Sequence, residues 1–163
     1  MYQFAITASK RSIDPANSYF VPDEMTMKIL VDDARRSVKV RVIVPSGHIE
    51  SGVVRQASRG SWGPMLQAGI EIAEFQPTMF HVKSLVVDGT FSSVGSTNFV
   101  DRSFRLNDEA KLNILSSAFG ATQQRVFDQD WALARRITLA EWKARQWTEG
   151  VLEPLANLLR SQP

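Results

Sequence analysis

Short apolar runs that suit β-strands alternate with amphipathic segments over residues 1–75. The clearest run is VKVRVIV, residues 38–44, which is rich in β-branched side chains and is followed by Pro45-Ser46-Gly47. Before it, residues 27–34 carry apolar side chains at the i, i+3, i+4 and i+7 spacing of a helix, downstream of Asp23, a favoured N-cap residue. Such alternation predicts an α/β sandwich in which helices flank a mixed β-sheet.

The remaining patterns predict the order of the elements. We expect a helix over residues 1–14, a strand over 16–21, helices over 23–37 and 51–68, strands over 38–44, 70–75, 80–87, 91–94 and 109–115, and helical structure after about residue 119. Asp88-Gly89 predicts a hairpin turn, and Thr138 with Glu141 forms a capping box for a further helix. We therefore expect one domain over residues 1–135 and a helical C-terminal extension over 136–163. The uncapped first helix suggests a piece of a longer chain.

Composition sets limits on the chemistry and the partners. With 44% hydrophobic and 22% charged residues among 163, the chain suits one globular domain with a core. It contains no cysteine, which excludes disulfides and thiolate metal sites. A formal net charge of +2 is too small to indicate a nucleic-acid partner. No apolar run reaches the roughly 20 residues that cross a bilayer.

Residues able to carry out chemistry concentrate between positions 81 and 98. Side chains two positions apart on a strand share a face, so His81 and Lys83 should point the same way. The hairpin that follows should bring Ser96 and Asn98 alongside them. An imidazole, an ammonium, a hydroxyl and an amide would then converge on one site.

This set of groups suits a phosphodiester substrate. An imidazole can attack phosphorus and form a covalent phosphoenzyme. Lys83 and Asn98 can hold the non-bridging oxygens as charge builds in the transition state. A carboxylate usually orients such an imidazole, and Glu109, at the start of the next predicted strand, is the candidate. Because the chemistry needs no carboxylate cluster, we expect neither a metal nor another cofactor.

The pattern H-x-K-x4-D-x6-G-S-x-N, from His81 to Asn98, resembles the HKD motif of the phospholipase D superfamily. Further segments resemble the C-terminal half of bacterial cardiolipin synthases: YFVPD at 19–23, ASRGSWG at 57–63, QPTM at 76–79, VGSTNF at 94–99 and RSFRLNDEA at 102–110. The resemblance implies the phospholipase D-like α/β/α sandwich. Two departures stand out, because Val100-Asp101 replaces an expected Asp-Asn and the second HKD motif of the family is absent.

The resemblance also implies roles for individual residues. The catalytic set would be His81, Lys83, Asp88, Ser96, Asn98 and Glu109. His81 would be the nucleophile or the general acid, while Lys83, Ser96 and Asn98 would bind phosphate. Asp88 belongs to the motif, but its place in a turn indicates a mainly structural role.

Three more residues are candidates for substrate binding. Arg102 and Arg105 follow the motif and are suited to a lipid phosphate or to a solvated surface. His48 follows the 38–44 strand, where α/β sheets often bind ligands, although a solvated loop is the alternative. Trp142 predicts either a membrane-interface helix, with Trp147 and the apolar residues of 151–159, or packing against the domain.

The expected function is phosphatidyl transfer between two phosphatidylglycerol molecules, giving cardiolipin in phospholipid biosynthesis. Two-step transfer needs two histidines, and His48 lacks the x-Lys companion. The partner is therefore a second HKD half, either upstream in a longer chain or from a second copy. We expect attachment to the bacterial cytoplasmic membrane, either by peripheral contact or through a segment absent from this chain. The alternatives are hydrolysis of a phosphodiester by a homodimer, as a phospholipase D or nuclease, and an inactive half-domain.

Overall fold

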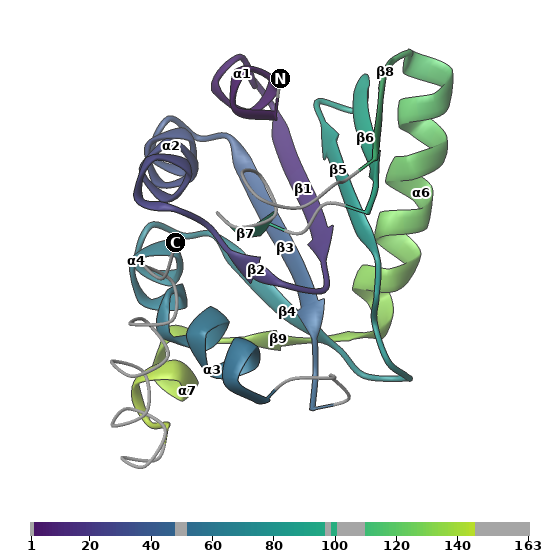
Figure 1. Ribbon diagram of the computed structural model, residues 1–163. Helices are drawn as coiled ribbons and strands as arrows, with labels where there is room; N and C mark the ends of the chain where they lie inside the picture. Colours follow the sequence, from purple (N-terminus) through teal and green to yellow (C-terminus); the bar gives the residue numbers. More distant parts are fainter. Residues whose placement is uncertain (1, 48–51, 97–98, 101–109, 146–163) are drawn as a thin grey trace.

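The computed structural model describes residues 2–47, 52–96, 99–100 and 110–145, which form a mixed sheet with helices on both faces (Figure 1). The sheet has the order β8-β6-β5-β1-β3-β4-β9. Its strands are β1 (Ser12–Asn17), β3 (Lys39–Pro45), β4 (Glu71–Phe75), β5 (Lys83–Val87), β6 (Phe91–Gly95), β8 (Lys111–Leu115) and β9 (Ala134–Ile137). A separate two-stranded sheet pairs β2 (Phe20–Val21) with β7 (Phe99–Val100).

Strand direction divides the large sheet into two parts. β1, β3 and β4 run parallel, as expected for strands joined through helices. On one side, β5, β6 and β8 continue the sheet with antiparallel pairs, and on the other β9 pairs antiparallel with β4. This arrangement confirms the predicted mixed sheet flanked by helices.

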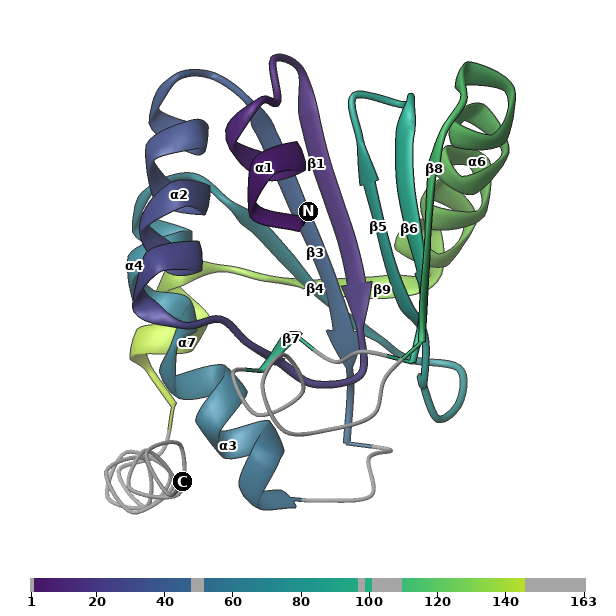
Figure 2. The same ribbon diagram turned by 45° about the horizontal axis from the view of Figure 1, so that its top comes forward.

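The helices lie in two layers, one on each face of the sheet (Figures 1 and 2). They are α1 (Tyr2–Thr7), α2 (Glu24–Arg35), α3 (Gly52–Gly60), α4 (Trp62–Gln67), α6 (Ser117–Leu133) and α7 (Leu139–Lys143). α6 covers one face, where Ile43 packs with Phe127 and Trp131. On the opposite face Val42 and its alternate neighbours pack with residues of α1, α2 and α4, including Leu30. The alternation of side chains along β3 thus supplies both cores.

The prediction for the N-terminus was wrong in its boundaries. The expected helix over residues 1–14 ends early, and Ile13 lies in β1 with no solvent exposure. Pro15 cannot donate a helical hydrogen bond, and pairing of β1 with strands on both sides fixes the extended form. The expected strand over 16–21 is divided between β1 and β2. Phe4 of α1 is 81% exposed.

Other predictions from the local sequence are confirmed. The Asp23 side chain accepts a hydrogen bond from the Thr26 N–H at the start of α2. Thr138 and Glu141 form both bonds of the predicted capping box. The helix expected over 51–68 is divided at Ser61 into α3 and α4. β9 was not predicted, because its short sequence becomes a strand only through pairing with β4.

Candidate active site

Three of the motif residues, His81, Lys83 and Ser96, lie at the edge of the sheet where the parallel strands end. Asn17, the last residue of β1, pairs with Lys83, the first residue of β5. At the same edge Gly95, the last residue of β6, pairs with Lys111, the first residue of β8. Ligands of α/β proteins bind at the carboxyl ends of parallel strands, so this edge is the candidate site.

His81 and Lys83 contact each other as the sequence predicted. His81 lies two residues before β5 and is exposed. The Lys83 Nζ is 2.9 Å from Nε2 and 3.2 Å from Nδ1 of the imidazole, and 3.3 Å from the His81 carbonyl oxygen. An imidazole and a cation thus lie together at the surface, an arrangement that suits attack on a phosphate anion.

Ser96 lies at the same edge, at the end of β6. Its N–H donates to the Ala110 carbonyl at 3.0 Å, and its hydroxyl accepts from the Ala110 N–H at 3.0 Å. A Cβ on Gly95 would meet the Ala110 carbonyl oxygen at 2.1 Å, so the close approach of these backbones requires glycine. The exposed Ser96 hydroxyl is therefore held in place by the segment that begins β8.

Asp88 lies at the opposite end of β5 from this site. Five residues of strand, about 17 Å, separate it from Lys83. Its carboxylate accepts the backbone N–H groups of Lys10, Arg11 and Ser12 at 2.7–2.9 Å. Burial would raise the pKa of Asp88, but these donors outweigh burial and hold the pKa below its usual range. The geometry supports the mainly structural role expected for Asp88.

The other predicted site residues lie outside the described part of the chain. They are Asn98, Glu109, Arg102, Arg105 and His48. Their roles stay predictions.

Asn17 borders the site and was not predicted from the sequence. It has no solvent exposure, and its Oδ1 accepts the Tyr19 N–H at 3.1 Å. The next residue, Ser18, donates its N–H to the Val82 carbonyl at 3.0 Å, between the two motif residues. The turn after β1 is thereby fixed against the His81–Lys83 segment. A polar residue ending a buried strand was the available signal, but the helix expected over 1–14 concealed the strand.

A second polar cluster lies at the opposite ends of the strands from the candidate site. Arg41 on β3 pairs with Asp14 at 2.7 Å and with Asp128 of α6 at 2.9 Å, beside an open hollow of about 410 Å³. Burial raises the pKa of Asp14, and the Arg41 guanidinium partly offsets that effect. Asp88 lines the same hollow, which places this cluster at the far end of β5 from His81.

A helix-flanked mixed sheet with a histidine and a lysine side by side at its carboxyl edge defines a domain suited to phosphodiester chemistry. The family model described as "Cardiolipin synthase, PLD-like domain" matches residues 3–131. The chain belongs to this family of the phospholipase D superfamily.

Sequence relatives support this assignment, and solved structures share the fold. Cardiolipin synthase A of Erwinia tasmaniensis is 34% identical over 93% of the chain, and cardiolipin synthase of Geobacillus thermodenitrificans is 34% identical over 98%. The aligned part is 31% and 32% of those proteins, so the chain spans about a third of their length. The phospholipase D family member Nuc from Salmonella typhimurium has the same fold, with a TM-score of 0.74 and 22% identity over 83% of this chain and 88% of that one. A phosphatidylserine synthase of Haemophilus influenzae matches 98% of this chain and 40% of its own, with a TM-score of 0.72 and 12% identity.

Proposed function

We propose that this domain supplies one of two half-sites of a phosphatidyltransferase of the cardiolipin synthase type. The observation that carries the proposal is the His81–Lys83 contact at the carboxyl edge of the sheet, in a chain that belongs to the cardiolipin synthase PLD-like family. The reaction would join two phosphatidylglycerol molecules into cardiolipin and release glycerol.

The proposed reaction has two steps and uses two histidines. In the first, one histidine nitrogen attacks phosphorus, an N–P bond forms, and the bond from phosphorus to the glycerol headgroup oxygen breaks. The other histidine gives its proton to that oxygen, and glycerol leaves. In the second, a hydroxyl of another phosphatidylglycerol returns a proton to that histidine while its oxygen attacks phosphorus. The N–P bond breaks, and cardiolipin forms with both histidines restored.

The residues of this chain would divide the work. His81 is one of the two histidines. Lys83, together with Asn98, holds the non-bridging oxygens as charge accumulates, and Ser96 adds a hydroxyl donor. Glu109 orients the imidazole through its other nitrogen. Neither step requires a metal or another cofactor.

The second half-site would come from another HKD domain, either in a longer polypeptide or in a second copy of this chain. The domain would reach its lipid by peripheral contact at the bacterial cytoplasmic membrane, or through a segment outside this chain. Within residues 2–47, 52–96, 99–100 and 110–145, no helix has the length and hydrophobicity to cross a bilayer.

Replacement of His81 tests the proposal. We expect His81→Ala to lower cardiolipin formation from phosphatidylglycerol at least about 100-fold, because it removes a nucleophile or a general acid. Mass spectrometry of the lipid products is the measurement, with the chain paired with its second half. Ser84→Ala is the matched control, because Ser84 is next to Lys83 in β5 and points to the opposite face. Equal product from the wild type and His81→Ala would disprove the proposal.

The second candidate is hydrolysis, in which water replaces the acceptor alcohol. The observation that favours it is the structural match to Nuc. The match covers 88% of the Nuc chain, so Nuc is a chain of about one such domain. A homodimer acting on lipid would release phosphatidate rather than cardiolipin. A nuclease would bind DNA with a steep dependence on salt concentration. If neither product forms with the second half present, the chain is the inactive half-domain.

A further inference from the structure

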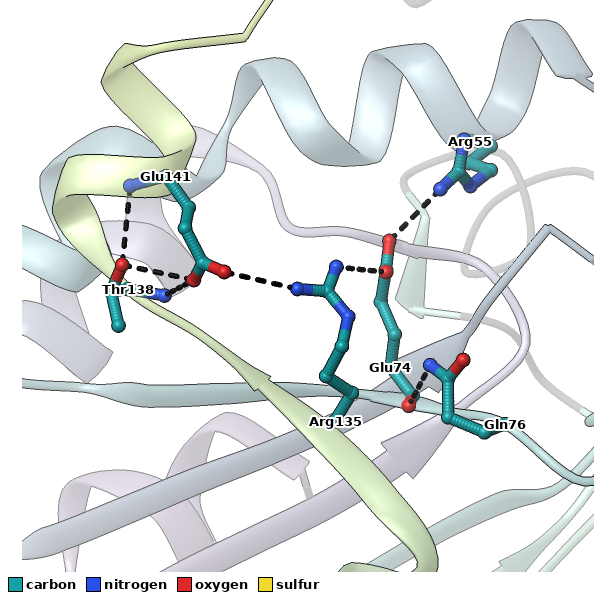
Figure 3. Close-up of polar contacts among 6 residues, drawn as sticks. All are labelled: Arg55, Glu74, Gln76, Arg135, Thr138 and Glu141. Carbon is teal, nitrogen blue, oxygen red and sulfur yellow. Dashed lines mark hydrogen bonds and ion pairs between the residues drawn. The ribbon is translucent and has the colours of Figure 1, made fainter.

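A buried carboxylate holds two arginines at the same edge of the sheet as the candidate site (Figure 3). Glu74, near the end of β4, has a side chain only 4% exposed. Its Oε1 accepts from Nη2 of Arg55 on α3, and its Oε2 accepts from Nη2 of Arg135 on β9, both at 3.1 Å. Burying a carboxylate destabilises the folded state unless the carboxylate is paired, and Glu74 is paired with both arginines.

The register of the strands places Glu74 in one row with Lys83. Glu74 pairs with Val44. Ala16 pairs with Ile43, so Asn17 is next to Val44 in the parallel pair, and Asn17 pairs with Lys83. Residues opposite each other on neighbouring strands point to the same face, so the four side chains of this row share one face. Three strand spacings of about 4.8 Å put the backbones of Glu74 and Lys83 roughly 14 Å apart.

The two arginines differ in how fully they are engaged. Arg135 also pairs with Glu141 at 3.2 Å. The Glu141 carboxylate accepts the Thr138 N–H and thereby caps α7 (Figure 3). Hydrogen bonds from Thr138 hold the pKa of Glu141 below its usual range, so this second anion stays charged. Arg135 thus joins two carboxylates and ties β9 to α7.

Arg55 is fixed by Glu74 and keeps unused donor capacity. Of its five N–H donors, Glu74 takes one at Nη2. The Nε–H of Arg55 is buried and has no acceptor within the described part of the chain. Its side chain is 28% exposed. A guanidinium that is held in place, partly desolvated and partly unsatisfied is suited to bind a phosphate.

We propose that Arg55, positioned by Glu74, binds a second phosphate and thereby selects an acceptor that carries its own phosphate group. This inference rests on the proposed function, because Lys83 would hold the reacting phosphate at the other end of the row. A phospholipid acceptor would bring its alcohol to the reacting phosphate while its own phosphodiester binds Arg55. Water and free glycerol carry no phosphate that could bind Arg55. Arg55 would then favour transfer between phospholipids over hydrolysis.

The ratio of transfer product to hydrolysis product tests the inference. We expect Arg55→Gln to lower the ratio of transfer product to hydrolysis product about tenfold or more, with phosphatidate formation kept, because one charge-assisted contact to the acceptor is lost. Arg135→Gln is the matched control, since it removes the other cation from Glu74 and should leave the ratio unchanged. An unchanged ratio in Arg55→Gln, or equal changes in both variants, would overturn the inference.

A binding measurement makes the test independent of catalysis. Inorganic phosphate is titrated into the chain while backbone amide resonances are followed, and two sites are expected. Lys83→Ala should abolish one site and Arg55→Gln the other, with Arg135→Gln retaining both. Phosphate binding that is insensitive to Arg55→Gln overturns the inference. If Arg55-dependent binding persists in a protein that forms neither product, the anion site stands and the proposed function fails.

Discussion

At the scale of single residues, the motif from His81 to Asn98 serves two separate purposes. His81 and Lys83 provide reactive groups at one edge of the sheet. Asp88 adopts a φ of 54° beside Gly89 at 65°, and the Thr90 N–H donates to the Val87 carbonyl, so two residues with positive φ form the hairpin turn. The aspartate both tolerates this backbone and accepts the N–H groups of residues 10–12, at the start of β1. It thereby joins the hairpin to the start of the sheet.

Replacing Asp88 should cost stability in a manner that depends on pH. Asp88→Asn keeps the shape but loses the negative charge, and we expect a loss of about 1–3 kcal/mol at pH 7 in the free energy of unfolding. The folded-state pKa of Asp88 is lowered, so its contribution is complete above the unfolded value of 3.8 and declines as pH falls below it. Urea unfolding at pH 7 and near pH 3 should therefore show that the difference in free energy of unfolding between the wild type and Asp88→Asn is smaller in acid.

Asp32→Asn is the control for that experiment. Asp32 makes only exposed pairs with Lys28 and Arg35 on α2, and such pairs contribute little. A gap between Asp88→Asn and the wild type that is equally large at both pH values would mean that charge is not the basis of the effect.

The sequence located His81 and Lys83 because their relation is local, two positions apart at the start of β5. Asn17 and Glu74 escaped prediction because only strand pairing places them in one row with Lys83: β1 pairs directly with β5, and β4 is connected to β1 through β3. The N-terminal helix prediction failed for the same reason. Ile13 fits an apolar stripe in isolation, and only pairing on both sides of β1 makes it part of a strand.

At the scale of elements, β9 and α7 attach the end of the described chain to the domain. Ile137 of β9 is buried in the core, and the Trp142 indole N–H donates to the Arg59 carbonyl of α3 at 2.7 Å. The guanidinium of Arg145 lies 3.8 Å from the centre of the Trp142 ring. Trp142 therefore packs against the domain, one of the two roles expected for it. Trp147 and residues 151–159 lie outside the described part of the chain.

The contact between α4 and α7 gives a prediction about Gly63. A Cβ at this position would meet the Trp142 ring at 2.5 Å, so Gly63→Ala should displace α7 and destabilise the fold by about 1–3 kcal/mol. Without this collision, alanine in a helix would be more favourable than glycine by up to about 1 kcal/mol. Thermal unfolding followed by circular dichroism measures the change.

A double mutant identifies the cause. In a Trp142→Ala background, Gly63→Ala should be neutral or stabilising, because the colliding ring is gone. Gly47→Ala is the control for the loss of a glycine, as no atom lies within 4 Å of its added Cβ. A cost for Gly63→Ala that persists without the Trp142 ring would contradict the packing explanation.

At the scale of the whole molecule, residues distant in sequence form one structural unit around the β4 edge. The predicted division between a domain ending at residue 135 and an extension from 136 runs through β9. Glu74 of β4 binds Arg135 of β9, and Arg135 binds Glu141 of α7, so ion pairs continue across that boundary. Arg55 shares Glu74 with this chain of contacts, which connects the C-terminal elements to the proposed phosphate subsite.

The need for two histidines makes a quantitative prediction for the isolated chain. Its mass is 18.3 kDa, and each copy carries one HKD motif. Transfer by this chain alone would require two copies, so activity should rise with concentration together with the light-scattering mass toward twice that of one copy. When wild type is mixed with His81→Ala and the subunits exchange, only pairs with two wild-type copies can complete both steps. Activity should therefore follow the square of the wild-type fraction.

At equal proportions of wild type and His81→Ala, about a quarter of randomly formed pairs contain two reactive histidines. A mixture of wild type with Ser84→Ala should keep its full activity, because both partners retain His81. Activity that falls only to half, and that is independent of concentration, would mean that one HKD motif completes the reaction by itself. The requirement for a second half-site would then be wrong, and the general acid would have to be sought within this chain.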